Sequence, residues 1–181
     1  MNPTRDYSWP AIALHWLAAL FIIGGFVLGL SMVDLPFSPQ RIKYYSWHKW
    51  IGITIWLLAL LRLIWRLLSP PPPPLPMPAW QRRAATATHH FLYALMLLIP
   101  VSGWLYSSAA GVSVVYLGLV PLPDLVAASK PLAADLKLLH KALNVSLLML
   151  VLLHVGAALK HQLLDRDETL ARMLPFLRRS R

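Results

Sequence analysis

Four long apolar segments constrain the fold of this chain more than any other feature of its sequence. They run from about Ala11 to Val33, Trp47 to Leu68, Thr88 to Ser107 and Leu136 to Lys160. Each approaches the ~20 residues that an α-helix needs to cross the hydrocarbon core of a bilayer. Only 13% of the 181 residues are charged, about half the fraction that is typical of a soluble domain. The sequence therefore predicts an all-α membrane protein, a single domain of residues 1–181 with four transmembrane helices.

Three further segments connect or follow these spans. Residues 69–80, SPPPPPLPMPAW, form a proline-rich linker that we expect to be extended, because a proline run cannot continue a helix. A docking site for the aromatic groove of a partner is the alternative for this linker. Residues 109–126 are apolar but contain two glycines and two prolines, which favours a surface loop or short interfacial helix over a fifth span. Residues 161–181 form a basic tail, for which we expect a short amphipathic helix on the inner leaflet.

The distribution of basic residues predicts the orientation in the membrane. Four spans place both termini on one side, and eleven lysines and arginines lie on that side against six on the other. The positive-inside rule then places both termini in the cytoplasm. The formal net charge of +10 is also a property of nucleic-acid-binding proteins. Because the basic residues cluster at the ends of apolar segments, we expect contact with membrane lipid and none with nucleic acid.

Histidines inside these segments are the second strong constraint, because ionisable side chains within a span are costly and usually face the bundle interior. His15 lies in the cytoplasmic part of the first span, and His48 lies at the outer end of the second. His140 and His154 lie fourteen residues apart in the fourth span. They therefore share nearly one helix face, roughly 21 Å apart along its axis. Matching depths predicts an outer pair, His48 with His140, and an inner pair, His15 with His154.

Two facing imidazoles in each layer suit a b-type haem better than another metal site. Zinc needs three or four ligands in all, whereas these spans carry almost no carboxylates and the chain has no cysteine. Haem brings four nitrogens of its own and needs only two axial ligands from the protein. We therefore predict a four-helix bundle that holds two b-type haems. The metal ligands are expected to be His15, His48, His140 and His154.

Other residues at the depth of the inner pair are candidates to contact its haem. Arg62 lies fourteen residues after His48, and Arg66 follows one turn later. Both are candidates to pair with haem propionates, which are anions that need charge-assisted hydrogen bonds. His89, at the cytoplasmic mouth of the third span, is a candidate to contact an inner propionate or to replace His15 as ligand.

Glycines and lysines near the outer pair have two interpretations each. Gly29 and Gly52 would let a porphyrin edge approach a helix closely, or would serve helix packing. Lysines follow both outer histidines, as Lys49 and Lys141, and Lys137 lies one turn before His140. These three lysines would guide a small anionic substrate by electrostatic focusing. A lysine collar that binds lipid phosphates is the alternative.

The order and spacing of these residues resemble bacterial cytochrome b561, a family of four-helix dihaem proteins of the inner membrane. The resemblance covers residues 8 to 175. It is carried by HW at His15 and Trp16, by His48 at the start of the second span, by RLIWR from Arg62 to Arg66, by the H-x3-Y-x6-P pattern of His89, Tyr93 and Pro100, by the pair His140 and His154, and by DETLARMLP from Asp167 to Pro175.

The resemblance implies haem ligation by the four paired histidines and electron transfer with ubiquinone. One branch of the family oxidises superoxide at the periplasmic face and passes the electron to ubiquinone. A superoxide:ubiquinone oxidoreductase is therefore the expected function. The first alternative is an electron-transfer or anchor subunit of a dehydrogenase, without a substrate of its own. The second is a non-redox haem-binding transport protein.

Overall fold

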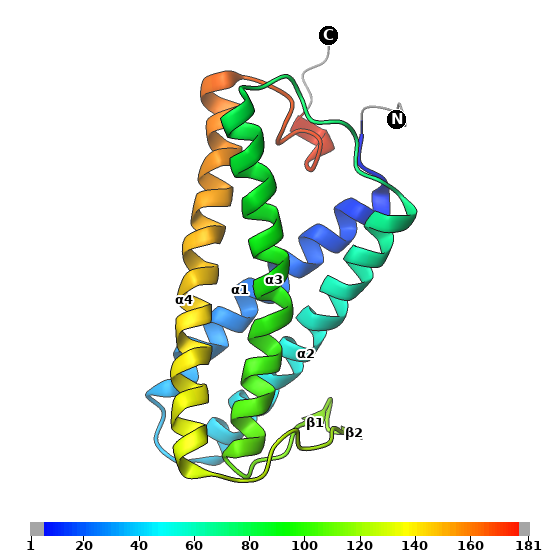
Figure 1. The fold of residues 1–181 in the computed structure, drawn as a ribbon. Coiled ribbons are helices and arrows are strands. Elements are labelled where there is room, and N and C mark those ends of the chain that lie inside the picture. The colour runs from blue at the N-terminus through cyan, green and yellow to red at the C-terminus, as the bar shows by residue number, and fades with distance from the viewer. Residues whose placement is uncertain (1–5, 178–181) are drawn as a thin grey trace.

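A computed structural model describes residues 6–177 as four long helices, a small β-hairpin and a folded tail (Figure 1). The helices are α1 (Trp9–Val33), α2 (Pro39–Leu68), α3 (Ala79–Ala109) and α4 (Lys130–Lys160). Strands β1 (Val115–Tyr116) and β2 (Val120–Pro121) lie between α3 and α4. The π-helical turn η1 (His161–Asp165) extends α4, and a 3-10 turn, η2 (Pro175–Leu177), follows. All four helices are long and apolar enough to cross a membrane, which confirms the predicted all-α class.

The helices extend beyond the apolar segments because polar turns continue them at one end. Helix α2 begins at Pro39, and its N-cap Ser38 accepts a hydrogen bond from the backbone N–H of Arg41 at 3.3 Å. Its 30 residues correspond to about 45 Å, the thickness of a bilayer with its headgroup layers. Proline lies in the first turn of α1, α2 and α4, where its missing N–H costs no hydrogen bond.

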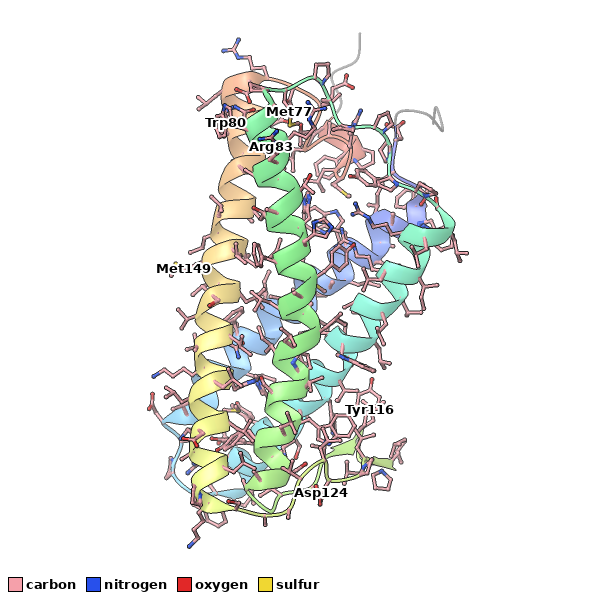
Figure 2. The ribbon with its side chains drawn as sticks, in the orientation of Figure 1. Met77, Trp80, Arg83, Tyr116, Asp124 and Met149 are labelled. Carbon is pink, nitrogen blue, oxygen red and sulfur yellow. The ribbon has the colours of Figure 1, made fainter. Side chains whose placement is uncertain are left out.

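The four helices pack as two antiparallel pairs that join through a central contact. Helix α1 packs on α2, α3 packs on α4, and α2 packs on α3. The buried core is small, with one cluster around Ala59 and Met96 and another around Ile99 and Leu147. Large apolar side chains instead cover the outside of the bundle, as Met149 does in Figure 2. This inverted distribution is the one expected where lipid is the solvent.

The loop between α3 and α4 is a β-hairpin that lies beside α2. Val115 pairs with Pro121 and Tyr116 with Val120, and Figures 1 and 2 show the hairpin folding back along the bundle. The Trp50 indole donates a hydrogen bond to the Val115 carbonyl at 2.7 Å, and the hydroxyls of Thr54 and Tyr116 lie 3.0 Å apart. The loop expected here is therefore present as an ordered hairpin, and the described residues contain no fifth span.

The expected amphipathic helix in the tail is absent from the described residues, and this prediction was wrong. The chain turns at Arg166, whose φ is +54°, and folds back over the end of the bundle where α1 begins and α4 ends (Figure 1). The Trp16 indole donates to the Met173 carbonyl and the Arg172 guanidinium donates to the Pro73 carbonyl, each at 2.8 Å. These contacts hold the tail against α1 and the proline-rich linker. Arg5, Arg178, Arg179 and Arg181, which contribute to the predicted charge asymmetry, lie outside the described residues.

Asp167 anchors this fold-back by local hydrogen bonds. Its carboxylate accepts from the Thr169 backbone N–H at 2.8 Å and lies 2.7 Å from Nδ1 of His161. Burial raises the pKa of this carboxyl, but the hydrogen bonds from Thr169 and His161 lower it more, so its pKa falls below the ordinary 3.8. Such local bonds favour a turn over a continued helix, which explains why the tail stops being helical here.

Candidate functional site

The structure brings together the two histidines of each predicted pair. The ring centres of His48 on α2 and His140 on α4 lie 6.3 Å apart, with their planes crossed at 87°. Those of His15 on α1 and His154 on α4 lie 6.2 Å apart, with their planes at 75°. Each pair therefore joins α4 to a helix of the other antiparallel pair, one near each end of the bundle.

The separations of the two pairs fit axial ligation of one metal ion from opposite sides. A histidine nitrogen lies about 2.0–2.1 Å from a first-row metal ion, and the ring centre lies about 1.1 Å beyond it, so two opposed ligands place their ring centres roughly 6.4 Å apart. The observed 6.2 Å and 6.3 Å agree with this value. The donor set is two neutral nitrogens without carboxylate or thiolate, which is the set that a six-coordinate haem requires.

Two glycines allow the outer rings to occupy these positions. A Cβ built on Gly103 of α3 would lie 3.0 Å from Cε1 of His140, and one built on Gly29 of α1 would lie 3.2 Å from Cε1 of His48. Both distances are shorter than ordinary van der Waals contact. Gly29 thus gives room to a histidine ring rather than only to a porphyrin edge. Gly52 has no heavy atom within 4 Å of its Cβ position, so packing does not explain it.

An apolar space lies beside the outer pair, between the four helices. Its volume is about 50 Å³, and it is lined by His48, His140 and Asn144 together with apolar side chains that include Phe26 and Leu147. A largely apolar wall with a few convergent polar groups is characteristic of cofactor sites. The chemistry of this lining suits an apolar ring system.

The inner pair is surrounded by further basic side chains. Nη1 of Arg62 lies 3.0 Å from Nδ1 of His15, and its guanidinium lies over the Tyr93 ring at 5.4 Å. His89 of α3 lies beside His154, with ring centres 5.4 Å apart. Arg66 is exposed. Arg62 and His89 therefore lie beside the inner pair, whereas Arg66 lies at the surface.

The three candidate lysines at the outer end have different environments. Lys49 donates a hydrogen bond to the Val112 carbonyl at 3.3 Å, so its ammonium group also supports the loop. Lys137 lines an open cavity with Lys130 and Tyr106, between the end of α3 and the start of α4. Lys141 is exposed. A cationic surface is thus present at the end of the bundle where the outer pair lies.

Sequence reasoning missed the side chain and the backbone group that contact the outer histidines through their second ring nitrogens. Oγ of Ser102 lies 2.9 Å from Nδ1 of His140, and the Gly25 carbonyl lies 3.1 Å from Nδ1 of His48. The run Pro100-Val-Ser-Gly103 was the available signal, because a proline, a serine and a glycine interrupt an otherwise apolar helix. A backbone carbonyl such as that of Gly25 leaves no signal in the sequence.

Comparisons with known proteins agree on one family. The family model for prokaryotic cytochrome b561 matches residues 6–176. Cytochrome b561 homolog 2 of Escherichia coli K12 is 38% identical over 177 residues, which cover 96% of this chain and 93% of the relative. Cytochrome b561 homolog 1 of the same organism is 32% identical over 174 residues, covering 93% and 97%. A probable superoxide oxidase, CybB, of Yersinia pestis is 32% identical over 177 residues, covering 94% and 97%.

Proposed function

The chain belongs to the prokaryotic cytochrome b561 family, and we propose that it is a dihaem superoxide:ubiquinone oxidoreductase of the bacterial inner membrane. The family binds b-type haem and transfers electrons. Four membrane-spanning helices fit a protein of that membrane. Family membership alone does not specify the number of haems, the electron donor, the electron acceptor or the orientation in the membrane, and all four are part of this proposal.

The spacing of the two histidine pairs is the observation that carries this proposal. His48 with His140 would hold one haem, and His15 with His154 the other, because both separations match axial ligation. The ring centres of His89 and His154 lie 5.4 Å apart, whereas those of His15 and His154 lie 6.2 Å apart, close to the 6.3 Å of the outer pair. We therefore assign His89 to the surroundings of the inner haem, where Arg62 would pair with a propionate. When bound, haem supplies reversible one-electron redox chemistry.

The outer cationic residues support an anionic electron donor. Lys130 and Lys137 line the open cavity at this end, and Lys141 follows the ligand His140. Superoxide is a small anion, which such a surface would concentrate near the outer haem. The Yersinia pestis relative is named as a probable superoxide oxidase, which favours this donor over others.

The reaction balances without covalent chemistry by the protein. Two superoxide anions each lose one electron and leave as O₂. One ubiquinone gains both electrons and two protons to become ubiquinol. Histidines 140 and 154 lie fourteen residues apart on α4, so this helix would hold a ligand of each haem roughly 21 Å apart along the electron path. The excess of cations on the side of the termini supports placing the inner pair toward the cytoplasm.

The proposal is tested with purified protein reconstituted in liposomes that contain ubiquinone. We expect a bis-histidine absorption spectrum, reduction of the haems by enzymatically generated superoxide, and ubiquinol formation that superoxide dismutase abolishes. Haems that dithionite reduces but superoxide does not would overturn the proposed donor and would favour the electron-transfer subunit. A protein without a bis-histidine spectrum would overturn the haem assignment itself.

A further inference from the structure

The two outer histidines each have a hydrogen-bond partner at Nδ1, the ring nitrogen that a metal ligand of this kind leaves free. A neutral imidazole that binds iron through Nε2 must carry its proton on Nδ1. Its partner at Nδ1 must therefore be an acceptor, and it fixes both the tautomer and the ring orientation. The chemical nature of each partner shows whether it can serve this role.

His140 faces a hydroxyl group whose own proton is already committed. Oγ of Ser102 donates to the Ile99 carbonyl at 2.7 Å and lies 2.9 Å from Nδ1 of His140. A hydroxyl has one proton and two lone pairs, so toward His140 it acts as the acceptor. Ser102 is 4% exposed, and burial prevents water from replacing this contact. His140 is thereby held with its proton on Nδ1.

His48 is held in the same tautomer by the backbone. Its Nδ1 lies 3.1 Å from the Gly25 carbonyl, which can only accept a hydrogen bond. Because this carbonyl belongs to the backbone, substituting Gly25 by another residue does not remove it. Ser102 is therefore the partner at the outer pair that mutation can remove without changing a ligand.

The inner pair has a contact of the opposite kind. Nη1 of Arg62 lies 3.0 Å from Nδ1 of His15, and a guanidinium is a donor only. It cannot accept a proton from Nδ1, so this contact must give way when His15 binds haem through Nε2, and Arg62 would then pair with a propionate as proposed above. An effect that depends on an acceptor at Ser102 is therefore specific to the outer pair, and the inner haem provides an internal control.

We propose that Ser102 is a positioning residue for the outer haem: its hydroxyl holds His140 in the tautomer that binds iron and strengthens it as a ligand. This inference rests on the proposed ligation of haem by His48 and His140. An acceptor at Nδ1 raises the basicity of the imidazole, which stabilises ferric over ferrous iron and lowers the reduction potential. Ser102 would thereby set how readily the outer haem takes an electron from its donor.

Redox titration of the purified dihaem protein tests this role. We expect Ser102→Ala to weaken the preference for ferric iron at one haem about tenfold, which corresponds to a rise of about 59 mV. The potential of the other haem stays at its parent value. Ser102→Thr, which keeps the hydroxyl, restores the parent potential, and Ser102→Cys, with a weak sulfur acceptor, gives an intermediate shift.

Ser108→Ala is the matched control. Ser108 is 2% exposed on the same helix and its hydroxyl donates to the Trp104 carbonyl, and no contact joins it to a histidine among its described hydrogen bonds. We expect both potentials to stay unchanged in this variant. A shift as large as that of Ser102→Ala would show a general effect of cavity formation and would overturn the proposal.

Three outcomes separate this inference from the proposed function. A parent protein without two bis-histidine haems overturns the haem assignment, and with it the basis of this inference. A dihaem parent whose potentials do not change in Ser102→Ala overturns the role of Ser102 alone. If Ser102→Ala loses the outer haem entirely, Ser102→Thr decides, because a shifted potential or a lost haem in that variant would also overturn it.

Discussion

Gly103→Ala is the substitution whose effect follows most directly from the geometry of the outer pair. The added Cβ would lie 3.0 Å from Cε1 of His140, whereas ordinary contact begins at 3.4 Å. The His140 ring must therefore give way by a few tenths of an ångström. Metal–ligand distances in proteins are held within about 0.2 Å, so a shift of this size impairs ligation. We expect haem affinity at the outer site to fall about 10–100-fold.

The same substitution should not destabilise the helices themselves. Alanine in place of glycine favours a helix by about 0.8–1.0 kcal/mol, so the apoprotein is expected to unfold at the parent temperature or above it. Loss of haem without loss of thermal stability is the combination that distinguishes a displaced ligand from a misfolded bundle. Haem content and the low-spin absorption bands report the first property, and thermal unfolding of the apoprotein reports the second.

Other glycines provide a graded series for this experiment. Gly29→Ala places a Cβ at 3.2 Å from Cε1 of His48 and should impair the outer haem less. Gly52→Ala and Gly156→Ala have no heavy atom within 4 Å of the added Cβ and should keep both haems. Parent-like haem content in Gly103→Ala, or an equal loss in Gly52→Ala, would refute the reasoning.

The remaining predictions concern the surface and the tail. Lys137→Glu with Lys141→Glu should slow reduction of the haems by superoxide. Added salt should slow this reaction in the parent but not in the variant, because salt shortens the distance over which surface charges attract an anion to about 8 Å. The same reversal at Arg82 and Arg83, near the opposite end of the bundle, should change neither rate. Asp167→Asn should expose the tail to proteolysis. In the parent, the stability that Asp167 contributes should be present above pH 3.8 and should disappear only as the pH falls below it, since the folded pKa is lowered. Leu119 is an apolar side chain on the hairpin that is 80% exposed, so we expect it to face lipid. A fluorophore attached at Leu119→Cys should therefore be quenched by brominated lipid more than the same fluorophore at Lys43→Cys.

The sequence was sufficient to predict the fold class and to group the histidines by depth. Apolar length identifies a span, and the fixed rise of a helix converts residue numbers into depth. His140 and His154 could thus be assigned to two layers. His48 and His15, on antiparallel spans, lie at the same two depths and could be assigned to these layers. The structure places the rings of both groupings close together, so this part of the reasoning needed only helix geometry.

The sequence could not predict contacts that depend on rotation of helices about their own axes. Ser102 and Gly103 contact His140 because α3 presents these two positions to α4, and no periodicity in so apolar a helix marks that face. The tail was mispredicted for a different reason. Its amphipathic pattern favours a helix, but hydrogen bonds to the Asp167 carboxylate and the contact of Met173 with Trp16 outweigh that preference.

The haem content of double histidine variants tests the central claim, two stacked haems with paired ligands, most directly. His48→Ala with His140→Ala should keep one haem per chain, and so should His15→Ala with His154→Ala, because each removes both ligands of a single haem. The crossed variant, His48→Ala with His154→Ala, removes one ligand from each haem and should lose both. A crossed variant that keeps one full haem while a matched variant loses both would contradict the pairing and the architecture proposed from it.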